Sequence, residues 1–339
     1  MKLLLQARKS SVLSPSTLKC LNDTPTLNPT AGCVHLCLYC YARGYSHYPG
    51  DGTVVLYTNL AKKLEHELNR KRKAPGFVYF SPSCDAFQPV KQVLDTTYSL
   101  MDLLLKRGIG VSFLTKGYIP DRFVTLFKSH SNIVQAHIGI TTLNRQLQKL
   151  IEPHTATPKT RLKNISTLVN IGILPEIKFD PLIPGLTDSK NNLEPLFKIL
   201  NKSGIKNVGL NYLFLRPVIY KNIRKALGQT KALKRISQAF CDNVDLTLLA
   251  RHSAGGQAGK SRVKALNLHF RKKQYRSISL LAERYGIETY VCGCKNPDVT
   301  NELTCRDIWQ KYFDKKTYQY RLFDNHNTAN PITQSASQD

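Results

Sequence analysis

Long apolar runs are absent from the 339 residues of this chain. No stretch approaches the roughly 18 apolar residues of a membrane-spanning helix, and the longest, such as Gly110 to Leu114, have the length of a strand. We therefore exclude an integral membrane protein. The start, MKLLLQARKS, contains three leucines but is broken by Gln6, Arg8 and Lys9, so its apolar core is too short for a secretory signal. We expect a cytoplasmic chain with no membrane partner.

Acidic residues are scarce, because 23 Asp and Glu stand against 49 Lys and Arg and leave a net charge of +26. Such an excess attracts polyanions, so nucleic acid is the first partner to consider and an anionic membrane surface the second. The hydrophobic content of 42% and the charged content of 21% are ordinary and exclude a wholly disordered or fibrous chain. The length suits one large α/β domain with an appendage as well as two domains.

Two common catalytic arrangements are also missing. We find no Ser-His-Asp set and no pair of carboxylates whose spacing supports acid–base catalysis. The stretch from Gly255 to Ser261, GGQAGKS, lacks the spacing of a phosphate-binding loop and follows no clear strand. Nucleotide hydrolysis is therefore not favoured.

Cysteine, in contrast, is present nine times and clusters at short spacings, which favours metal ligation in a reducing compartment over a disulfide framework. Cys33, Cys37 and Cys40 form a C-x3-C-x2-C triplet. Three thiolates on one short loop can hold three irons of a [4Fe–4S] cluster and leave the fourth iron open. Two alternatives are a Zn²⁺ ion completed by His35 or His47, and buried thiols without metal.

Helix-like and strand-like segments alternate from about residue 53 to 216. We expect a first helix around 60–68, and then strands and helices in turn at 77–81, 91–107, 110–115, from 121 onwards, 133–141, 158–170, 174–179, 189–202 and 207–213. With a short strand before Cys33, these make about six βα units, which predicts an α/β fold with a parallel sheet in an open or partial barrel.

The expected strands end in polar residues, and the chemistry of such a barrel lies where its strands end. These polar ends are Ser81 to Asp85, Thr115–Lys116, Thr141–Thr142, Asp180 to Gly185 and Asn211 to Arg216. Because parallel strands end at one edge of the sheet, we expect the five segments to form one site.

The cysteine triplet has an aromatic residue, Tyr39, directly before its third cysteine. This pattern resembles the radical S-adenosylmethionine (SAM) superfamily, whose motif C-x3-C-x-aromatic-C follows the first strand of a partial (βα)6 barrel. Within that superfamily the chain resembles the spore photoproduct lyase-like group, often labelled DNA repair photolyases. The resemblance covers roughly residues 25 to 216, and its supporting segments are 30–42, 80–89, 114–116, 139–142 with Glu152-Pro153, and 181–185.

The resemblance implies a [4Fe–4S] cluster held by Cys33, Cys37 and Cys40, with SAM chelating the open iron. One electron from the cluster would cleave SAM to methionine and a 5′-deoxyadenosyl radical, which abstracts a hydrogen atom from the substrate. Six further side chains would contact SAM: Tyr39 beside the adenine, Lys116 at the carboxylate, Thr141 and Thr142 at the ribose or methionine, and Ser81 and Ser83 at the amino group.

Cys84 is a candidate catalytic residue. In spore photoproduct lyases a cysteine after the second strand donates hydrogen to the product radical, and Cys84 falls close to that position when the chains are aligned on Asp85. The alternative is a small buried residue without a chemical role.

A second cysteine group, Cys292, Cys294 and Cys305, has the spacing C-x-C-x10-C. It predicts a second iron-sulfur cluster, a structural zinc or unligated thiols, with Cys241, Cys20 or no residue as the fourth ligand. The spore photoproduct lyases proper lack this element, so the resemblance does not extend to a thymine-dimer substrate.

Residues 216 to 276 contain 15 Lys and Arg but only two acids, and they carry interleaved aromatic residues, among them Phe240 and Tyr275. We expect this module to line a groove for a phosphate backbone, the alternative being a solvated helix face. The chain then divides into an N-terminal lead-in at 1–24, the radical SAM partial barrel at 25–216, a basic C-terminal extension with the cysteine knuckle at 217–323, and a disordered tail at 324–339.

The function hypothesis is a radical SAM enzyme acting on DNA or RNA, by lesion repair or by modification of a base or sugar, with a flavodoxin- or ferredoxin-type electron donor. Two alternatives remain: radical SAM chemistry on a peptide or small molecule, and a non-catalytic nucleic-acid-binding protein whose cysteines hold zinc.

Overall fold

The computed structural model describes residues 1–15, 21, 24–249 and 260–299. Several residues considered in the sequence analysis lie outside the described residues: the candidate ligands Cys20 and Cys305, residues 255–259 of the glycine-rich stretch, and the tail at 324–339.

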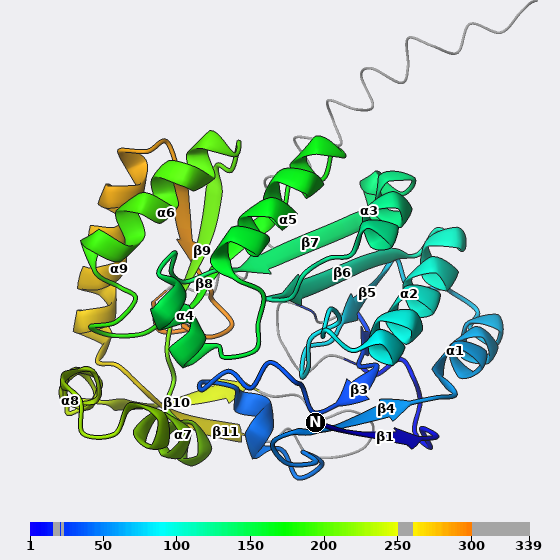
Figure 1. Ribbon diagram of the computed structural model, residues 1–339, viewed down its shortest axis with the longest axis horizontal. Helices are drawn as coiled ribbons and strands as arrows, with labels where there is room; N and C mark the ends of the chain where they lie inside the picture. Colours follow the sequence, from blue (N-terminus) through cyan, green and yellow to red (C-terminus); the bar gives the residue numbers. More distant parts are fainter. Residues whose placement is uncertain (16–20, 22–23, 250–259, 300–339) are drawn as a thin grey trace, which may run out of the picture.

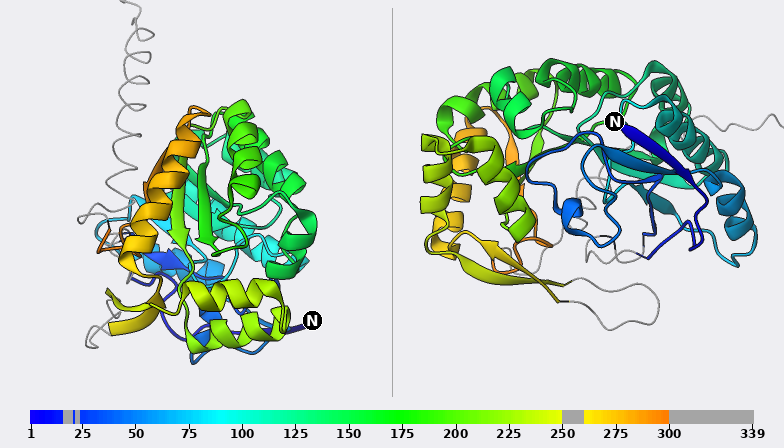
Figure 2. Two further views of the ribbon diagram at one scale, coloured as in Figure 1. Left: turned by 90° about the vertical axis from the view of Figure 1, so that its left-hand side faces the viewer. Right: turned by 60° about the horizontal axis from the view of Figure 1, so that its bottom comes forward.

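A parallel sheet dominates the described part of the chain (Figure 1). Its seven strands pair in the order β12 (Glu288–Val291), β9 (Asn207–Tyr212), β8 (Glu176–Leu182), β7 (Val134–Gly139), β6 (Gly110–Thr115), β5 (Phe77–Phe80) and β2 (Thr26–Leu27). Every neighbouring pair in this order is parallel. The sheet is curved rather than closed, as the tilted view in Figure 2 shows. The predicted α/β fold with a partial barrel is therefore confirmed.

Helices cover the outer face of this sheet (Figures 1 and 2). They are α1 (Leu60–Asn69), α2 (Lys91–Lys106), α3 (Asp121–Lys128), α5 (Pro158–Asn170), α6 (Lys190–Lys202) and α9 (Leu268–Glu283). The first five were expected from apolar periodicity, and the buried positions Leu60, Leu64 and Leu68 of α1 illustrate the reason, since they face the core together.

Helix α4 (Arg145–Ile151) was not expected from the sequence. Its start is nevertheless marked locally, because the Asn144 side chain accepts a hydrogen bond from the Leu147 N–H at 2.9 Å as an N-terminal cap. The helix is only seven residues long, which is too short for a periodic apolar pattern to stand out.

A second, three-stranded sheet consists of β1 (Lys2–Gln6), β4 (Thr53–Tyr57) and β3 (Thr30–Ala31). β4 pairs with β1 in parallel and with β3 in antiparallel orientation. The strand that immediately precedes Cys33 is therefore β3, whereas the first strand of the main sheet is the earlier β2. Two short 3-10 helices lie in connections: η2 (Tyr41–Gly44) between β3 and β4, and η3 (Ser131–Ile133) between α3 and β7.

The chain after β9 forms α7 (Pro217–Leu227), α8 (Lys231–Ala239) and an antiparallel hairpin of β10 (Val244–Leu249) and β11 (Lys260–Ala265). It then returns through α9 to β12, which adds a strand beside β9. Part of the segment expected as an extension therefore belongs to the barrel sheet.

The prediction that the aromatic residues of the basic module line a groove is wrong for Phe240 and Tyr275. Both side chains are buried, at 6% and 4% exposed, and the Tyr275 hydroxyl donates to Asn296 Oδ1 at 3.2 Å. Arg271 is fully buried and is bound by Asp298, so its charge does not contribute to a basic surface.

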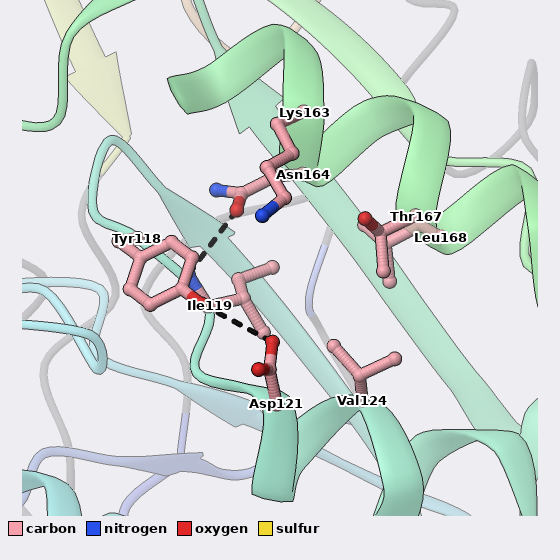
Figure 3. A pocket seen from close by; sticks show the side chains of 8 residues that line it. All are labelled: Tyr118, Ile119, Asp121, Val124, Lys163, Asn164, Thr167 and Leu168. Atoms are coloured by element: carbon pink, nitrogen blue, oxygen red, sulfur yellow. Dashed lines mark hydrogen bonds between the residues drawn. The ribbon is translucent and has the colours of Figure 1, made fainter.

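None of the helices in the described part of the chain combines the length and the apolar character that crossing a bilayer requires. The small cavity between α3 and α5 in Figure 3 has a volume of about 10 Å³, room for a water molecule at most, and it is lined by Tyr118, Asn164 and neighbouring residues. We assign it no function.

Candidate active site

The buried carboxylate of Asp85 links the ends of two neighbouring strands, β5 and β6. It accepts hydrogen bonds from Thr115 Oγ1 at 2.7 Å and from the Lys116 N–H at 2.9 Å, and it lies 3.3 Å from His35 Nδ1. Burial opposes the ionisation of Asp85, but His35 and these hydrogen bonds outweigh it and hold the pKa of Asp85 below its ordinary value. Asp85 thus ties the end of β5, the end of β6 and the cysteine loop together.

The loop that carries Cys33, Cys37 and Cys40 is held by its backbone. Gln88 Oε1 accepts from the Val34 N–H at 2.9 Å, and the Leu38 N–H donates to the Ile151 carbonyl at 3.0 Å. Gly32 begins the loop with φ +81°, and a Cβ at this position would lie 2.6 Å from the Thr53 carbonyl oxygen, so the close approach requires glycine.

The three thiols of this loop lie in a low-dielectric setting. Burial raises the pKa of Cys33 and of Cys40, and burial together with the Glu152 carboxylate raises the pKa of Cys37 to about 12. Without a bound cation these groups are neutral thiols, so ligation of a metal would release protons.

Tyr39, between the second and third cysteine, joins a buried ion pair. Its hydroxyl donates to Glu152 Oε1, and Glu152 Oε2 pairs with Arg161 Nη2. Glu152 and Arg161 are 0% and 1% exposed. Arg161 also donates to the carbonyl oxygen of Gly139 at 2.9 Å, at the end of β7. The network fixes the cysteine loop to α4, to α5 and to the sheet.

Lys116 crosses the mouth of the barrel. Its Nζ lies 5.5 Å from the centroid of the Tyr39 ring and donates to the Asp180 carbonyl oxygen at 3.2 Å. Gly139 makes room for it, since a Cβ there would lie 2.9 Å from Lys116 Nζ. The cation is therefore placed between the cysteine loop and the end of β8.

Three candidate site residues follow β5, namely Ser81, Ser83 and Cys84. Ser83 and Cys84 share one neighbour, Asn28. Ser81 is buried and has a positive φ of 58°, and its Oγ finds no hydrogen-bond partner among the described residues. Ser83 Oγ donates to Asn28 Oδ1 at 3.0 Å, and Cys84 Sγ lies 3.6 Å from the same oxygen. A positive φ in a non-glycine residue is strained and is found disproportionately at functional sites.

Thr141 and Thr142 follow β7 and are both 1% exposed. Within the described ranges the Oγ1 of Thr141 has no hydrogen-bond partner, whereas Thr142 Oγ1 accepts from the Asn144 N–H at 3.0 Å. Thr142 therefore has a local structural role in the turn before α4.

Three buried polar atoms around this mouth lack a hydrogen-bond partner in the described part of the chain, namely His35 Nε2, Ser81 Oγ and Thr141 Oγ1. Buried polar atoms in proteins are nearly always hydrogen-bonded, so orphans gathered at one site indicate a polar ligand. With three thiols on one loop and one lysine opposite them, the donor set fits an iron-sulfur cluster and the polar groups of SAM. In the described ranges no three Cys, His, Asp or Glu side chains lie close enough to bind one metal ion together.

The C-terminal cysteines Cys292 and Cys294 lie at the end of β12, next to the same mouth. Lys295 forms an ion pair with Asp180, and Asn296 Nδ2 donates to Asn211 Oδ1 at 3.0 Å. Burial opposes ionisation of Asp180, but Lys295 and Lys116 lower its pKa.

Cys241, which the sequence suggested as a fourth ligand, is exposed just after α8 and donates to the Ser237 carbonyl. Its place as a ligand beside Cys292 and Cys294 stays a prediction.

The predicted gathering of strand ends is visible in the hydrogen bonds that join Asp85 to Thr115 and Lys116, Lys116 to Asp180, and Asp180 to Asn211 at 2.9 Å. Sequence reasoning missed Glu152 with Arg161 and missed Asn28. The dipeptide Glu152-Pro153 was noticed as part of the resemblance, but nothing in the spacing indicated its partner.

Residues 27–193 match the family model of the radical SAM superfamily. These residues form a radical SAM domain. The radical SAM assignment made from the cysteine motif is confirmed, and it indicates an enzyme whose exact reaction the comparisons leave open.

The chain is 30% identical over 200 residues to an uncharacterized protein of Mycobacterium bovis, an alignment that covers 56% of this chain and 59% of the relative. It is 31% identical over 168 residues to an uncharacterized protein of Methanocaldococcus jannaschii, covering 48% of this chain and 61% of the relative. The matches thus span about six tenths of the length of these relatives.

Among solved structures, a spore photoproduct lyase complexed with dinucleoside spore photoproduct superposes with a TM-score of 0.64 at 13% identity, covering 85% of this chain and 82% of that one. A double mutant of spore photoproduct lyase with bound AdoMet and the same dinucleoside gives a TM-score of 0.65 at 14% identity, covering 85% and 81%. At this identity the likeness establishes a shared fold.

Proposed function

We propose that the chain binds a [4Fe–4S] cluster through Cys33, Cys37 and Cys40, cleaves SAM at it, and acts on a nucleic acid. The observation that carries the proposal is that Lys116 Nζ lies 5.5 Å from the ring of Tyr39, on the loop that carries the three thiols, with the hydroxyls of Ser81 and Thr141 buried at the ends of β5 and β7. When bound there, the cluster and SAM supply a hydrogen-abstracting radical.

The side chains around the mouth would hold SAM by complementary chemistry. Lys116 would pair with the SAM carboxylate, Ser81 would accept from the amino group, and Thr141 would bond the ribose or methionine. Tyr39 would pack beside the adenine, its hydroxyl held by Glu152. For Ser83 and Thr142, which already hydrogen-bond Asn28 and Asn144, a contact with SAM would need a second hydrogen bond.

A nucleic-acid substrate is supported by two observations. The net charge of +26 favours a polyanion. The spore photoproduct lyases that share the fold are described as bound to a dinucleoside photoproduct, and this chain would by analogy take a nucleotide at the same mouth. We further propose that residues 25–216 hold the cofactors, that the 217–323 segment contacts the strand, and that a flavodoxin- or ferredoxin-type protein in a reducing compartment supplies the electron.

The test is anaerobic reconstitution followed by measurement of iron, sulfide and 5′-deoxyadenosine, with and without an oligonucleotide. Cys37→Ala should remove most of the iron bound at the loop, whereas Cys241→Ala, which changes an exposed cysteine, should leave the iron content unchanged. Stimulation of SAM cleavage by DNA or RNA supports the substrate class. Colourless protein that binds zinc and cleaves no SAM contradicts the proposal.

We also propose Cys84 as the donor of a hydrogen atom to the substrate radical, since its Sγ lies beside Asn28 near the cysteine loop. A thiol exchanges its hydrogen with solvent, so turnover in D2O should place deuterium in the product of the wild-type chain. Cys84→Ala should give product without this deuterium, and Cys241→Ala should give the wild-type pattern. Deuterium retained in the Cys84→Ala product would refute the role.

Cys292 and Cys294, with Cys305 outside the described residues, are proposed to hold a second cluster or a structural zinc. Metal analysis of Cys292→Ala separates the choices, because loss of iron with the Cys33 loop still occupied indicates a cluster and loss of zinc indicates a structural ion. An unchanged metal content in this variant contradicts both.

A further inference from the structure

A cavity of about 300 Å³ adjoins both ends of the cysteine loop, where Gly32 and Ala42 line it. Its other walls come from the N-terminal segment, the turn between β2 and β3, and the segment that follows Cys40. The volume is at the lower end of the range of about 300 to 1,000 Å³ for small-molecule sites. Among the described residues that line it, Arg8 is the one Lys or Arg, and none is Asp or Glu.

Arg8 is held in place by neutral partners. Its guanidinium donates to the Asn28 carbonyl at 3.3 Å, to Ser10 Oγ at 3.3 Å and to Ser14 Oγ at 3.4 Å. Its backbone N–H and carbonyl are both bound by the Asn59 side chain, at 2.8 and 3.2 Å. Among the ion pairs of the described residues none involves Arg8. The carboxylate that acts on its charge, that of Glu67, accepts hydrogen bonds from the Val12 and Leu13 N–H groups at 2.7 and 3.1 Å, which leaves the guanidinium able to pair with an anion.

Aromatic rings form much of the remaining wall. Tyr45, His47, Tyr48 and Tyr57 all line the cavity. The Tyr45 and His47 rings lie 5.4 Å apart at 31°, and the Arg8 guanidinium lies 5.3 Å from the centre of the Tyr57 ring. Aromatic faces beside a guanidinium are the elements with which proteins hold a nucleotide of a single strand, because every base has a face to stack.

Two neighbours connect this cavity to the rest of the proposed chemistry. Asn28 and Ser83 line it, and Asn28 Oδ1 lies 3.6 Å from Cys84 Sγ, so its wall adjoins the candidate hydrogen donor. η2, which follows the cysteine loop, packs against α7, as Figures 1 and 2 show. Together α7 and α8 carry six Lys and Arg and no Asp or Glu, a surface that suits the backbone of a strand.

We propose that this cavity, which we name the Arg8 cavity, holds one nucleotide of the substrate strand, with its phosphate on Arg8 and its base against the tyrosines. The proposal rests on the proposed nucleic-acid substrate and adds where one nucleotide of it binds. The nucleic-acid strand would then run from the Arg8 cavity across α7. The nucleotide bound in the cavity would lie next to Cys84.

The experiment measures binding of a fluorescein-labelled single-stranded 12-mer DNA to the full, reconstituted chain over a range of salt concentrations. Arg8→Gln should weaken binding by about tenfold and reduce the slope of log K against log salt by about 0.7, the contribution of one phosphate contact to a single strand. Tyr45→Ala should weaken binding by about tenfold through lost stacking, with an unchanged salt slope. Arg70→Gln, which removes one exposed charge at the end of α1, should change neither quantity.

Because Arg8 also anchors the N-terminal segment, a second measurement uses the unmodified protein. Ultraviolet crosslinking of a 12-mer that contains 5-iodouracil should give crosslinked peptides with Tyr45, Tyr48 or Tyr57. Crosslinks confined to other peptides overturn the proposal.

The outcomes separate the two proposals. If the wild-type chain binds the DNA but Arg8→Gln and Tyr45→Ala behave like Arg70→Gln, the Arg8 cavity is not the nucleotide site and the proposed substrate class stands. If the wild-type chain binds neither DNA nor an RNA of the same length, the proposed substrate class fails and this inference falls with it. If Arg8→Gln lowers the affinity for SAM rather than for DNA, the cavity belongs to the cofactor and the inference is overturned.

Discussion

The Nζ of Lys116 lies 5.5 Å from the centre of the Tyr39 ring. A residue that follows β6 therefore contacts the loop that carries the three cysteines. The pair places a cation beside the ring that we expect next to the adenine of SAM. It depends on Gly139, which has no side chain to occupy the path of the lysine.

Gly139→Ala tests this dependence. The added Cβ would lie 2.9 to 3.1 Å from three atoms of Lys116, and because a lysine side chain is flexible, we expect it to move while the fold survives. SAM affinity should then fall by about tenfold, the scale of one charged hydrogen bond, with a small change in melting temperature. Gly76→Ala is the control, since a Cβ there meets no atom within 4 Å. Equal SAM affinity in both variants would show that the position of Lys116 is unimportant.

The buried network of Tyr39, Glu152 and Arg161 predicts unequal effects of two substitutions. Glu152→Gln leaves the Arg161 charge buried without its partner and should lower the free energy of unfolding by about 3 to 5 kcal/mol. Tyr39→Phe removes one donor but keeps the ion pair, so its loss should be about 1 to 2 kcal/mol. Urea unfolding of the two variants at neutral pH measures the difference. A larger loss in Tyr39→Phe than in Glu152→Gln would contradict the assignment.

Glu176, the first residue of β8, predicts a pH dependence of stability. Burial opposes its ionisation, but Lys178 at 2.7 Å and His137 outweigh burial and lower the pKa of Glu176 from 4.5 to about 2. Because the pKa of Glu176 is lower in the folded than in the unfolded chain, its ionised form stabilises the folded protein at pH values above 4.5. This stabilisation amounts to at most about 3 kcal/mol, and it is lost as the pH falls from 4.5 towards 2.

The measurement is urea unfolding of the wild-type chain and of Glu176→Gln between pH 7 and pH 3. The difference between the two should be constant above about pH 5 and shrink below pH 4.5. Asp102→Asn, which removes a surface pair with the exposed Lys106, is the control and should follow the wild-type curve throughout. A Glu176→Gln difference that grows as the pH falls would refute the prediction.

Arg271 anchors the turn that follows β12. It is 0% exposed and donates to Asp298 at 2.9 Å and to Asn296 at 3.0 Å. Arg271→Met removes these charged hydrogen bonds and should lower the free energy of unfolding by about 2 to 3 kcal/mol and increase hydrogen exchange at 288–299. The neighbouring exposed Lys272→Met is the control and should change neither. Unaltered exchange in Arg271→Met would show that the turn is held by other contacts.

Local spacing along the chain was sufficient to predict the five helices α1, α2, α3, α5 and α6, the strands β5 to β9 and the cysteine triplet. Leu60, Leu64 and Leu68 already mark one face of a helix, and Cys33, Cys37 and Cys40 are close along the chain. The meeting of strand ends followed from the parallel order, because parallel strands end at a common edge.

The residues that complete the site from distant parts of the sequence were identified from the tertiary structure alone. Glu152 is linked to Tyr39 across more than a hundred positions, and Arg8 and Asn28 reach the cysteine loop from the N-terminal segment. The return of β12 to the main sheet and the burial of Phe240 and Tyr275 in the core were equally hidden from the sequence. The physical reason is that long-range packing decides which side chains are buried, and the spacing of residues along the chain does not encode this packing. Only a buried charge or polar group requires a partner, so the partners cannot be read from the spacing either.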